Sequence, residues 1–169
     1  GSLLHYLQAA RNTTGYGVEI AADNINACTA RGIAVIQANI DTGLGVFETN
    51  AFDFVILSQT LQAMHNTEAV IQEILRIGKQ AIVSFPNFGY WRVRTQLWLG
   101  GRMPVSDTLP YEWYNTPNIH LCTIKDFEVF CAEQGIRILE TCVTHTGKPI
   151  HSLANWRGSL AFFRIEKTQ

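Results

Sequence analysis

The alternation of apolar runs and amphipathic segments along the chain predicts a sheet flanked by helices. Apolar residues recur at helical spacing in four segments: residues 1–12, 21–32, 66–78 and 124–134. Shorter runs rich in β-branched and aromatic residues are typical of strands, and they occupy residues 16–20, 33–40, 52–59, 80–85, 136–145 and 159–167. Strands that alternate with helices predict a Rossmann-like α/β fold, doubly wound around a mostly parallel sheet.

Local signals refine this pattern. The run from Phe54 to Leu57 is apolar at every position, which is typical of a parallel strand covered on both faces. Asn66 is a candidate N-cap for the helix after that strand, and Thr123 with Asp126 makes a capping-box-like start for a later helix. Because no helix separates the last two strands, we expect them to form a C-terminal antiparallel hairpin.

Residues 86–122 show no steady period and are long for a connection. The segment is dense in aromatic side chains and carries several arginines, the residue types that concentrate binding energy in protein interfaces. The candidates for contact with a partner are Trp91, Arg92, Arg94, Arg102 and Trp113. Aromatic side chains also fold under the edge of a sheet and cover its core, so both a core cover and an interface or lid stay open.

The composition suits one globular domain over residues 1–169. The chain is 47% hydrophobic and 16% charged, which allows a sizeable core. A formal net charge of −1 gives no general attraction to nucleic acid, and no apolar run approaches the roughly 20 residues that span a bilayer. The four cysteines form no C-x-x-C pair, which argues against a disulfide scaffold or a metal site and favours reduced thiols in a cytoplasmic protein.

A carboxylate closes the first predicted strand, in "YGVEIAADNI". Ligands of open α/β sheets bind beyond the carboxyl ends of the strands, where Glu19, beside Ile20, can accept two hydrogen bonds from a ribose diol. The alternative is a carboxylate that answers the dipole of the next helix. Two more strand ends favour a nucleotide, because Asn39 and Ile40 can meet an adenine and Gln59 can meet an amino-acid moiety.

The sequence opens at a helix, so the first strand and glycine-rich turn that normally begin a nucleotide-binding sheet are missing from it. His120 is a candidate catalytic residue, as a general base at the carboxyl edge of the sheet. The competing interpretation is a histidine whose hydrogen bonds are satisfied in a structured loop. The other histidines show no ligand spacing, and no metal site is predicted.

Four strings carry a resemblance to a known family: "TGYGVEI", "FPNFGYWRVR", "GRMPVSDTLPYEWYNTPNIHLCT" and "KDFEVFCAEQGIRIL". On these strings, and over nearly its whole length, the chain resembles the MetW family of methionine biosynthesis proteins. The resemblance implies the fold of class I S-adenosylmethionine-dependent methyltransferases, with Glu19 on the ribose hydroxyls of S-adenosylmethionine and Asn39 where such proteins often carry an adenine-reading aspartate. It also implies a partner, homoserine O-acyltransferase (homoserine O-acetyltransferase), which activates homoserine for methionine synthesis.

Two functions of different classes follow. The first is an interaction protein, a methyltransferase-like domain that binds and activates the acyltransferase. The second is an active methyltransferase on a small acceptor, since methyl transfer needs little acid–base help once the nucleophile is in line. The segment 86–122 distinguishes them, because an enzyme folds it over the cofactor whereas a partner protein presents its aromatic and basic side chains outward.

Overall fold

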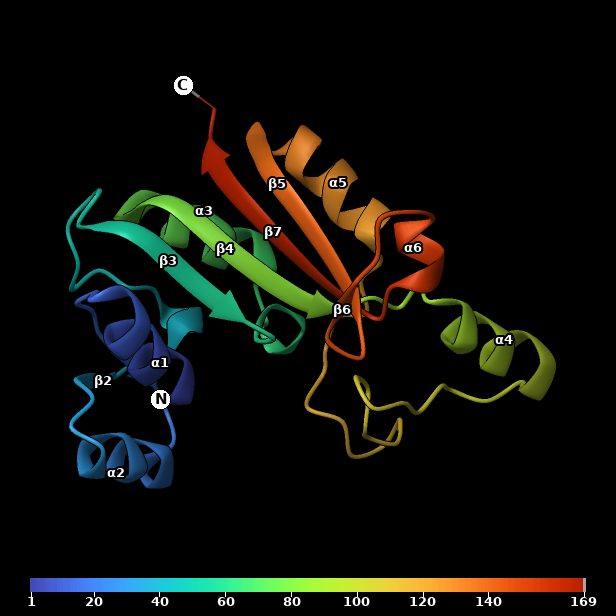
Figure 1. The fold of residues 1–169 in the computed structure, drawn as a ribbon, viewed down its shortest axis with the longest axis horizontal. Coiled ribbons are helices and arrows are strands. Elements are labelled where there is room, and N and C mark those ends of the chain that lie inside the picture. The colour runs from blue at the N-terminus through green and yellow to red at the C-terminus, as the bar shows by residue number, and fades with distance from the viewer. Residues whose placement is uncertain (169) are drawn as a thin grey trace. The chain divides into compact units, whose positions relative to one another are not determined.

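The computed structural model describes residues 1–168, which group into two compact units, residues 1–45 and the residues from Val46 onward (Figure 1). Whether residues 1–169 act as a single domain stays a prediction. The elements of the sequence pattern are present in both units, with the strands and helices in the predicted order.

The first unit is built on two parallel strands. Its elements are α1 (Ser2–Arg11), β1 (Gly17–Glu19), α2 (Ala22–Ala30), β2 (Val35–Gln37) and the 3-10 helix η1 (Ile40–Thr42). Val18 of β1 lies opposite Ile36 of β2. The connection from β1 through α2 to β2 is therefore a βαβ unit, and the carboxyl ends of both strands meet at one edge.

The second unit contains a mixed five-stranded sheet. Its elements are β3 (Phe52–Ser58), η2 (Leu61–Ala63), α3 (Thr67–Ile77), β4 (Gly78–Pro86), α4 (Trp91–Gly100), α5 (Ile124–Glu133), β5 (Ile136–His145), β6 (Lys148–Pro149), α6 (Ala154–Arg157) and β7 (Leu160–Lys167). The strand order is β3-β4-β7-β5-β6, with β3 and β4 parallel and the other pairs antiparallel. The predicted antiparallel pairing of the last two long strands is confirmed, and β7 lies between β4 and β5.

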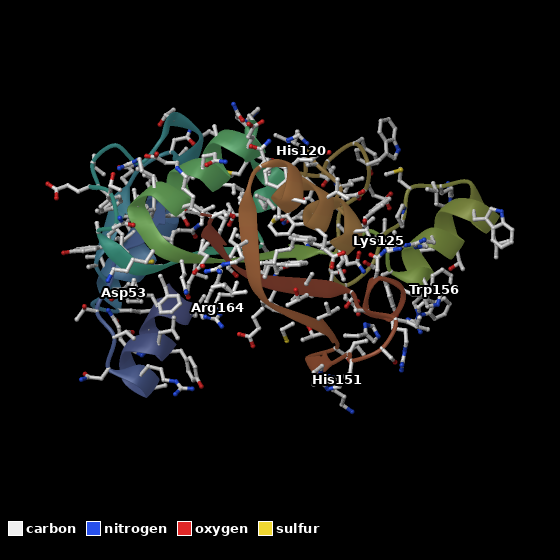
Figure 2. The ribbon with its side chains drawn as sticks, turned by 90° about the horizontal axis from the view of Figure 1, so that it is seen from above. Asp53, His120, Lys125, His151, Trp156 and Arg164 are labelled. Carbon is white, nitrogen blue, oxygen red and sulfur yellow. The ribbon has the colours of Figure 1, made fainter. Side chains whose placement is uncertain are left out.

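The core of this unit lies between the sheet and two helices on one face, α3 and α5 (Figure 2). Phe127 of α5 packs on Phe85 of β4 and Phe163 of β7, with ring centroids 5.1 and 4.7 Å apart. Each of these side chains is almost fully buried, and burying one contributes roughly 2 kcal/mol. Both helices begin as predicted: Asn66 caps α3 through the N–H of Ala69, and a complete capping box starts α5.

The opposite face of the sheet is less covered at β3 than the sequence predicts. Phe54 and Ile56 are exposed, so the prediction that this strand is covered on both faces is wrong for the unit itself, whose helices α3 and α5 lie on one face only. Polar contacts follow on the neighbouring strands, where Arg164 donates to Gln80 and Glu140 (Figure 2). Residues from Val46 onward thus bury one sheet face in an apolar core and leave the other partly polar.

Two helices were not predicted, α4 and α6. Of α4, only Val93 is buried, so this helix has no apolar stripe whose period the sequence could reveal. α6 is a single turn within the loop between β5 and β7. The segment 86–122 is therefore partly helical, and it extends beyond the carboxyl end of β4 (Figure 1).

One buried amide joins the end of β4 to the rest of this unit. Asn87 is 1% exposed, and its side-chain nitrogen donates to the carbonyls of Gly158 and Asn155 at 2.8 and 3.1 Å. Its side-chain oxygen accepts from the N–H groups of Gly89 and Ile124 at 2.9 and 3.3 Å. All the hydrogen-bonding capacity of this amide is used, which is the condition for burying it without loss of stability.

Replacing Asn87 by alanine is expected to lower the free energy of unfolding by about 3 kcal/mol, because buried N–H and C=O groups lose their partners at roughly 1–3 kcal/mol each before relaxation. Urea denaturation monitored by circular dichroism measures the change. Asn115→Ala is the matched control, since Asn115 is exposed and surface substitutions stay within about 0.5 kcal/mol. Equal effects of the two substitutions would contradict the assignment.

Candidate functional site

Glu19 lies at the carboxyl end of β1 and accepts three hydrogen bonds. Its Oε1 receives the N–H groups of Ile20 and Ala21 at 2.9 and 3.0 Å, and its Oε2 receives the amide of Asn24 at 3.0 Å. The N–H of Ala21 is the largest cause that holds the pKa of this carboxyl below its ordinary value, opposed by partial burial. Ala21 is the N-cap of α2, and its side chain makes no capping hydrogen bond. The carboxylate of Glu19 takes this role by accepting the N–H of Ala21.

The interpretation of Glu19 as a helix-start acid is thus supported by contacts. The contacts at the helix start leave part of the carboxylate free. Oε2 accepts one hydrogen bond from the described residues, whereas a carboxylate has about four acceptor positions in all. The same group is able to serve the helix and a diol together. Its binding role stays a prediction.

Asn39 and Ile40 lie at the carboxyl end of β2, the strand that pairs with β1. The side-chain oxygen of Asn39 accepts the N–H of Asp41 at 3.0 Å and caps η1. Ile20 is 60% exposed, which leaves its apolar side chain open to contact. The structure therefore brings four of the predicted cofactor residues, Glu19, Ile20, Asn39 and Ile40, to one edge of the first unit.

Gln59, the fifth predicted cofactor residue, belongs to the second unit. Its φ is 49°, in the left-handed region that non-glycine residues rarely adopt. Ser84 fixes this conformation, because its carbonyl and hydroxyl both accept the N–H of Gln59, at 3.0 and 3.1 Å. Strain of this kind is concentrated at functional sites, and here it directs the chain away from β3 into η2.

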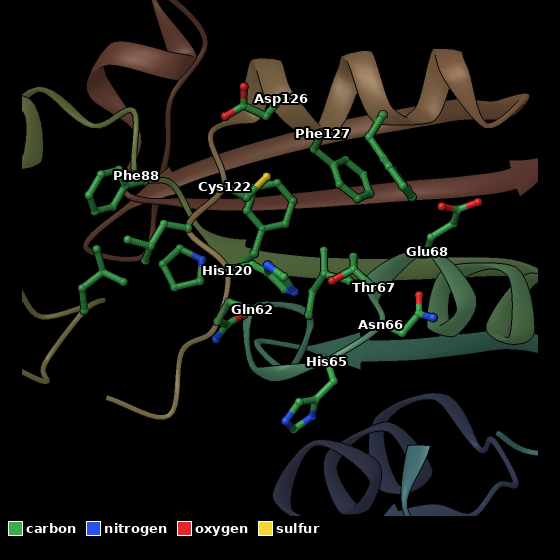
Figure 3. A pocket seen from close by; sticks show the side chains of 16 residues that line it. Gln62, His65, Asn66, Thr67, Glu68, Phe88, His120, Cys122, Asp126 and Phe127 are labelled. Atoms are coloured by element: carbon green, nitrogen blue, oxygen red, sulfur yellow. The ribbon is translucent and has the colours of Figure 1, made fainter. Parts of the chain in front are cut away.

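A pocket of about 370 Å³ opens beside this turn (Figure 3), within the size range of small-molecule sites. Its walls come from η2, the start of α3, the end of β4, residues 120–122 and α5. The lining residues are Leu61, Gln62, His65, Asn66, Thr67, Glu68, Phe85, Pro86, Phe88, Leu109, His120, Leu121, Cys122, Asp126, Phe127 and Phe130.

Gln62 holds one wall of the pocket together. Its main-chain carbonyl accepts the N–H groups of Ile119 and His120 at 2.7 and 2.9 Å, and its side-chain nitrogen donates to the carbonyl of Gln59 at 2.7 Å. His120, the predicted general-base candidate, therefore lines the pocket from a loop anchored through its backbone. Its catalytic role stays a prediction.

The thiol of Cys122 lines the same pocket. Burial, followed by the carboxylate of Asp126, raises the pKa of Cys122 to about 12. Its Sγ donates to the carbonyl of Thr123 at 3.1 Å. A thiol with so high a pKa is protonated near neutrality, and because the thiolate is the nucleophile, Cys122 offers no thiolate for covalent chemistry in this pocket.

The five predicted partner residues fall into two groups. Arg92, Arg102 and Trp113 are exposed, and Trp91 is 38% exposed beneath the guanidinium of Arg92, 5.5 Å from the ring centroid. Arg94 is engaged within the unit: it donates to the carbonyl of Gly89 and lies 5.5 Å from the ring of Trp156. Arg94 is exposed as well, so it contributes to the local fold and its partner role stays a prediction.

The five predicted partner residues include the exposed Trp113 but leave out three other highly exposed apolar residues of this segment. Trp98 is 82% exposed, Leu99 75% and Tyr114 70%. Sequence reasoning also missed the polar residues of the pocket, Gln62 and Thr67, because they come from a turn and a helix start with no motif. The sequence does carry a signal for the exposure of Trp98, because this tryptophan lies in the aromatic-rich segment 86–122, which has no regular apolar spacing that would predict its burial.

No group of three His, Cys, Asp or Glu side chains in residues 1–168 is placed to hold a metal ion. None of the helices in the described part of the chain is long and apolar enough to cross a bilayer. The four cysteines are free thiols.

Comparison with known proteins decides the family. The family profile described as "Methionine biosynthesis protein MetW" matches residues 1–165. The chain belongs to the MetW family. A relative named bifunctional methionine biosynthesis protein MetXA/MetW, from Rhodopirellula baltica, is 43% identical over 125 residues, or 73% of this MetW chain. The chain spans 20% of the length of that relative.

Solved structures confirm the fold class predicted for this MetW chain. A putative S-adenosylmethionine-dependent methyltransferase from Listeria monocytogenes is similar, with a TM-score of 0.67 at 12% identity, over 98% of this chain and 86% of that one. An S-adenosylmethionine-dependent methyltransferase from Thermotoga maritima, described as a possible histamine N-methyltransferase, gives 0.64 at 16% identity over 95% and 76%. The fold is that of class I methyltransferases, and at such identities the likeness shows the fold alone.

The raised pKa of Cys122 predicts slow alkylation. At pH 8 roughly one thiol in ten thousand is ionised at a pKa of about 12, so iodoacetamide should modify the exposed Cys142 first and leave Cys122 unmodified. Because the pKa is raised, the labelling rate of Cys122 should be low near neutrality and should rise about tenfold per pH unit until the pH reaches that value.

Peptide mass spectrometry after timed quenching reads out both sites. Unfolding the protein in urea before labelling is the control, and it should equalise the two cysteines. Equal labelling rates in the folded protein would show that Cys122 is neither buried nor protonated as described.

Proposed function

We propose that this MetW-family chain binds and activates a homoserine O-acyltransferase in methionine biosynthesis. The observation that carries the proposal is an exposed aromatic surface on α4 and the chain after it. We call it the aromatic surface and define it by its most exposed apolar residues: Trp98, Leu99, Trp113 and Tyr114. Each half of this surface is a pair of adjacent exposed apolar residues, and such pairs are candidate interaction sites, since exposed apolar residues that occur singly are ordinary.

The composition of the aromatic surface suits a partner protein. Trp113 and Tyr114 meet edge to face, with ring centroids 5.8 Å apart, and so form a stiff pair. Rigid aromatic side chains lose little conformational entropy on binding and dominate hot spots. The exposed guanidinium groups of Arg92 and Arg102 add donors for acidic groups on a partner.

The named relative supports the same partner. The Rhodopirellula baltica protein carries MetXA and MetW in one bifunctional name, and this chain spans a fifth of it. Linking two modules raises their effective concentration, which favours modules that work together. We take MetXA to be the homoserine O-acyltransferase and extend the pairing from that relative to this chain.

The first unit supplies the features for S-adenosylmethionine. The free acceptor positions of Glu19 suit the ribose hydroxyls, the exposed Ile20 and the half-buried Ile40 suit the faces of the nucleoside, and Asn39 suits an adenine edge. The role expected of Gln59, in the second unit, stays a prediction. Bound S-adenosylmethionine would serve as a signal of the state of the pathway. The free cysteines agree with a cytoplasmic protein.

The pocket favours a second candidate, an S-adenosylmethionine-dependent methyltransferase acting on a small acceptor. It has the volume and apolar walls of a small-molecule site, and His120 at its wall is within the class of residues that remove protons. Turnover of S-adenosylmethionine in the presence of the acyltransferase and its substrates distinguishes the candidates, because an activator leaves the cofactor unchanged.

Trp98→Ala and Trp113→Ala are each expected to weaken association with the acyltransferase about tenfold or more, as hot-spot tryptophans do. Biolayer interferometry with immobilised acyltransferase measures the dissociation constants. Both side chains are exposed, so the unfolding midpoints should stay at the value of the parent protein.

Val129→Ala is the control, since Val129 is exposed on α5, away from the aromatic surface. Its affinity should equal that of the unsubstituted protein. Unchanged affinity in both tryptophan variants would remove the aromatic surface from the interface.

Glu19→Gln is expected to reduce affinity for S-adenosylmethionine at least tenfold, or about 1.4 kcal/mol, because a neutral amide accepts hydrogen bonds from a diol less well than a carboxylate. Calorimetric titration of the full-length protein measures it. Asp23→Asn removes a charge from the next helix as the control. Identical affinity of the parent protein and Glu19→Gln would overturn the ribose role.

A further inference from the structure

The pocket of the second unit has an apolar floor and a small number of polar atoms. Phe85, Phe127 and Phe130 line it with the apolar side chains of the neighbouring segments. The rings of Phe127 and Phe130 stack, with centroids 6.1 Å apart. Burying the hydrocarbon part of a ligand against such walls is favourable by roughly 25 cal/mol per Å².

Two residues that line the pocket each carry a buried side-chain oxygen without a partner among the described residues. Gln62 Oε1 and Thr67 Oγ are buried and make no hydrogen bond to the described residues. The amide nitrogen and the main-chain carbonyl of Gln62 are both engaged, so only its carbonyl oxygen is left over. An unpaired buried acceptor destabilises a protein by about 1–3 kcal/mol, and a ligand that brings an N–H or O–H donor removes the penalty.

Two carboxylates and two histidines, His65 and His120, line the pocket. Glu68 and Asp126 line it on different sides (Figure 3), and no lysine or arginine does. Glu68 has no partner among the described residues, whereas Asp126 accepts the N–H of Thr123 with one oxygen. The field in the pocket therefore favours a cation and disfavours a carboxylate or phosphate.

From this geometry we infer that the pocket binds a small primary amine with an apolar or aromatic body and no acidic group. The ammonium group donates to Gln62 Oε1 and Thr67 Oγ and is attracted by Glu68 and Asp126. The hydrocarbon body lies on the phenylalanine rings, whose faces also attract cations. A free amino acid is a poorer ligand, because its carboxylate would enter a site that two acids line and no lysine or arginine lines.

This inference goes beyond the proposed function and does not rest on it. The aromatic surface and the residues proposed for S-adenosylmethionine are different from the residues of the pocket. Loss of acyltransferase binding in Trp98→Ala would leave the amine site unaffected, and failure of amine binding would leave the partner proposal unaffected.

The test uses three probes of one shape: phenethylamine, phenethyl alcohol and 3-phenylpropanoate. Titration of the full-length ¹⁵N-labelled protein, followed by NMR, gives the affinities and the residues that respond. Phenethylamine is expected to bind at least tenfold more tightly than 3-phenylpropanoate, with the alcohol between them. The amides of residues 62–68 and 120–127 should shift.

Two substitutions locate the recognition. Glu68→Lys reverses the charge and should weaken phenethylamine at least tenfold while strengthening 3-phenylpropanoate, whereas Glu133→Lys makes the same change at an exposed position outside the pocket and should alter neither. Thr67→Val removes one unpaired oxygen while keeping the shape. It should weaken the amine and the alcohol about fivefold without lowering the unfolding midpoint.

The inference is overturned if none of the probes binds, if the carboxylate binds as tightly as the amine, or if the shifts fall outside the pocket. It is also overturned if Glu68→Lys and Glu133→Lys change affinity equally, since the attraction would then be the general charge of the protein. A preference for the amine that Glu68→Lys reverses, with shifts confined to the pocket, establishes the site.

Discussion

The fold of the second unit depends on one buried side chain, the amide of Asn87. Three of its hydrogen bonds join the end of β4 to the start of α5 and to the chain that leads into β7, and a fourth goes to nearby Gly89. These segments are distant in sequence, and a buried amide is stable only when all of its groups are paired. The junction therefore has one arrangement. It sets the position of Phe85 and Pro86 in the pocket wall and the direction in which the chain leaves toward α4.

The elements with a strong period were predictable, and those without one were not. The run of Val70, Ile71, Ile74 and Leu75 fixes the buried face of α3, and all four are buried. The cap at Asn66 and the capping box at Thr123 are local signals that a sequence displays directly. In contrast, α4 buries only Val93 and gives no such signal.

The site was predictable where it follows from position along a strand. Glu19 ends β1, and Asn39 and Gln59 come just after the ends of β2 and β3, close to the strand ends that the patterns of hydrophobic residues predict. The pocket was not predictable in the same way, because its lining comes from separate segments that meet only in the folded unit. The oxygens of Gln62 and Thr67 are unpaired because no neighbouring group in the folded unit donates to them. These neighbours come from separate segments, so no single stretch of sequence predicts the unpaired oxygens.

The two interpretations of Glu19 that the sequence posed as alternatives are compatible in the structure. One carboxylate oxygen accepts the first N–H groups before α2, and the other keeps room for a further donor. A side chain already held by the backbone loses little freedom on binding a ligand, so the helix contacts would prepare the group for a diol.

Gly89 has a consequence for how this protein can vary. A Cβ atom there would lie 2.5 Å from the side-chain oxygen of Asn155 and 2.9 Å from that of Asn87, closer than atoms in van der Waals contact. Nine residues further on, the side chain of Trp98 is 82% exposed and has no such close neighbours to restrict it. Within this short segment, the residue at position 89 is constrained by packing, whereas the side chain at position 98 is exposed and is not constrained in this way. Substitutions at the exposed positions of this segment could therefore change its surface without disturbing the buried positions.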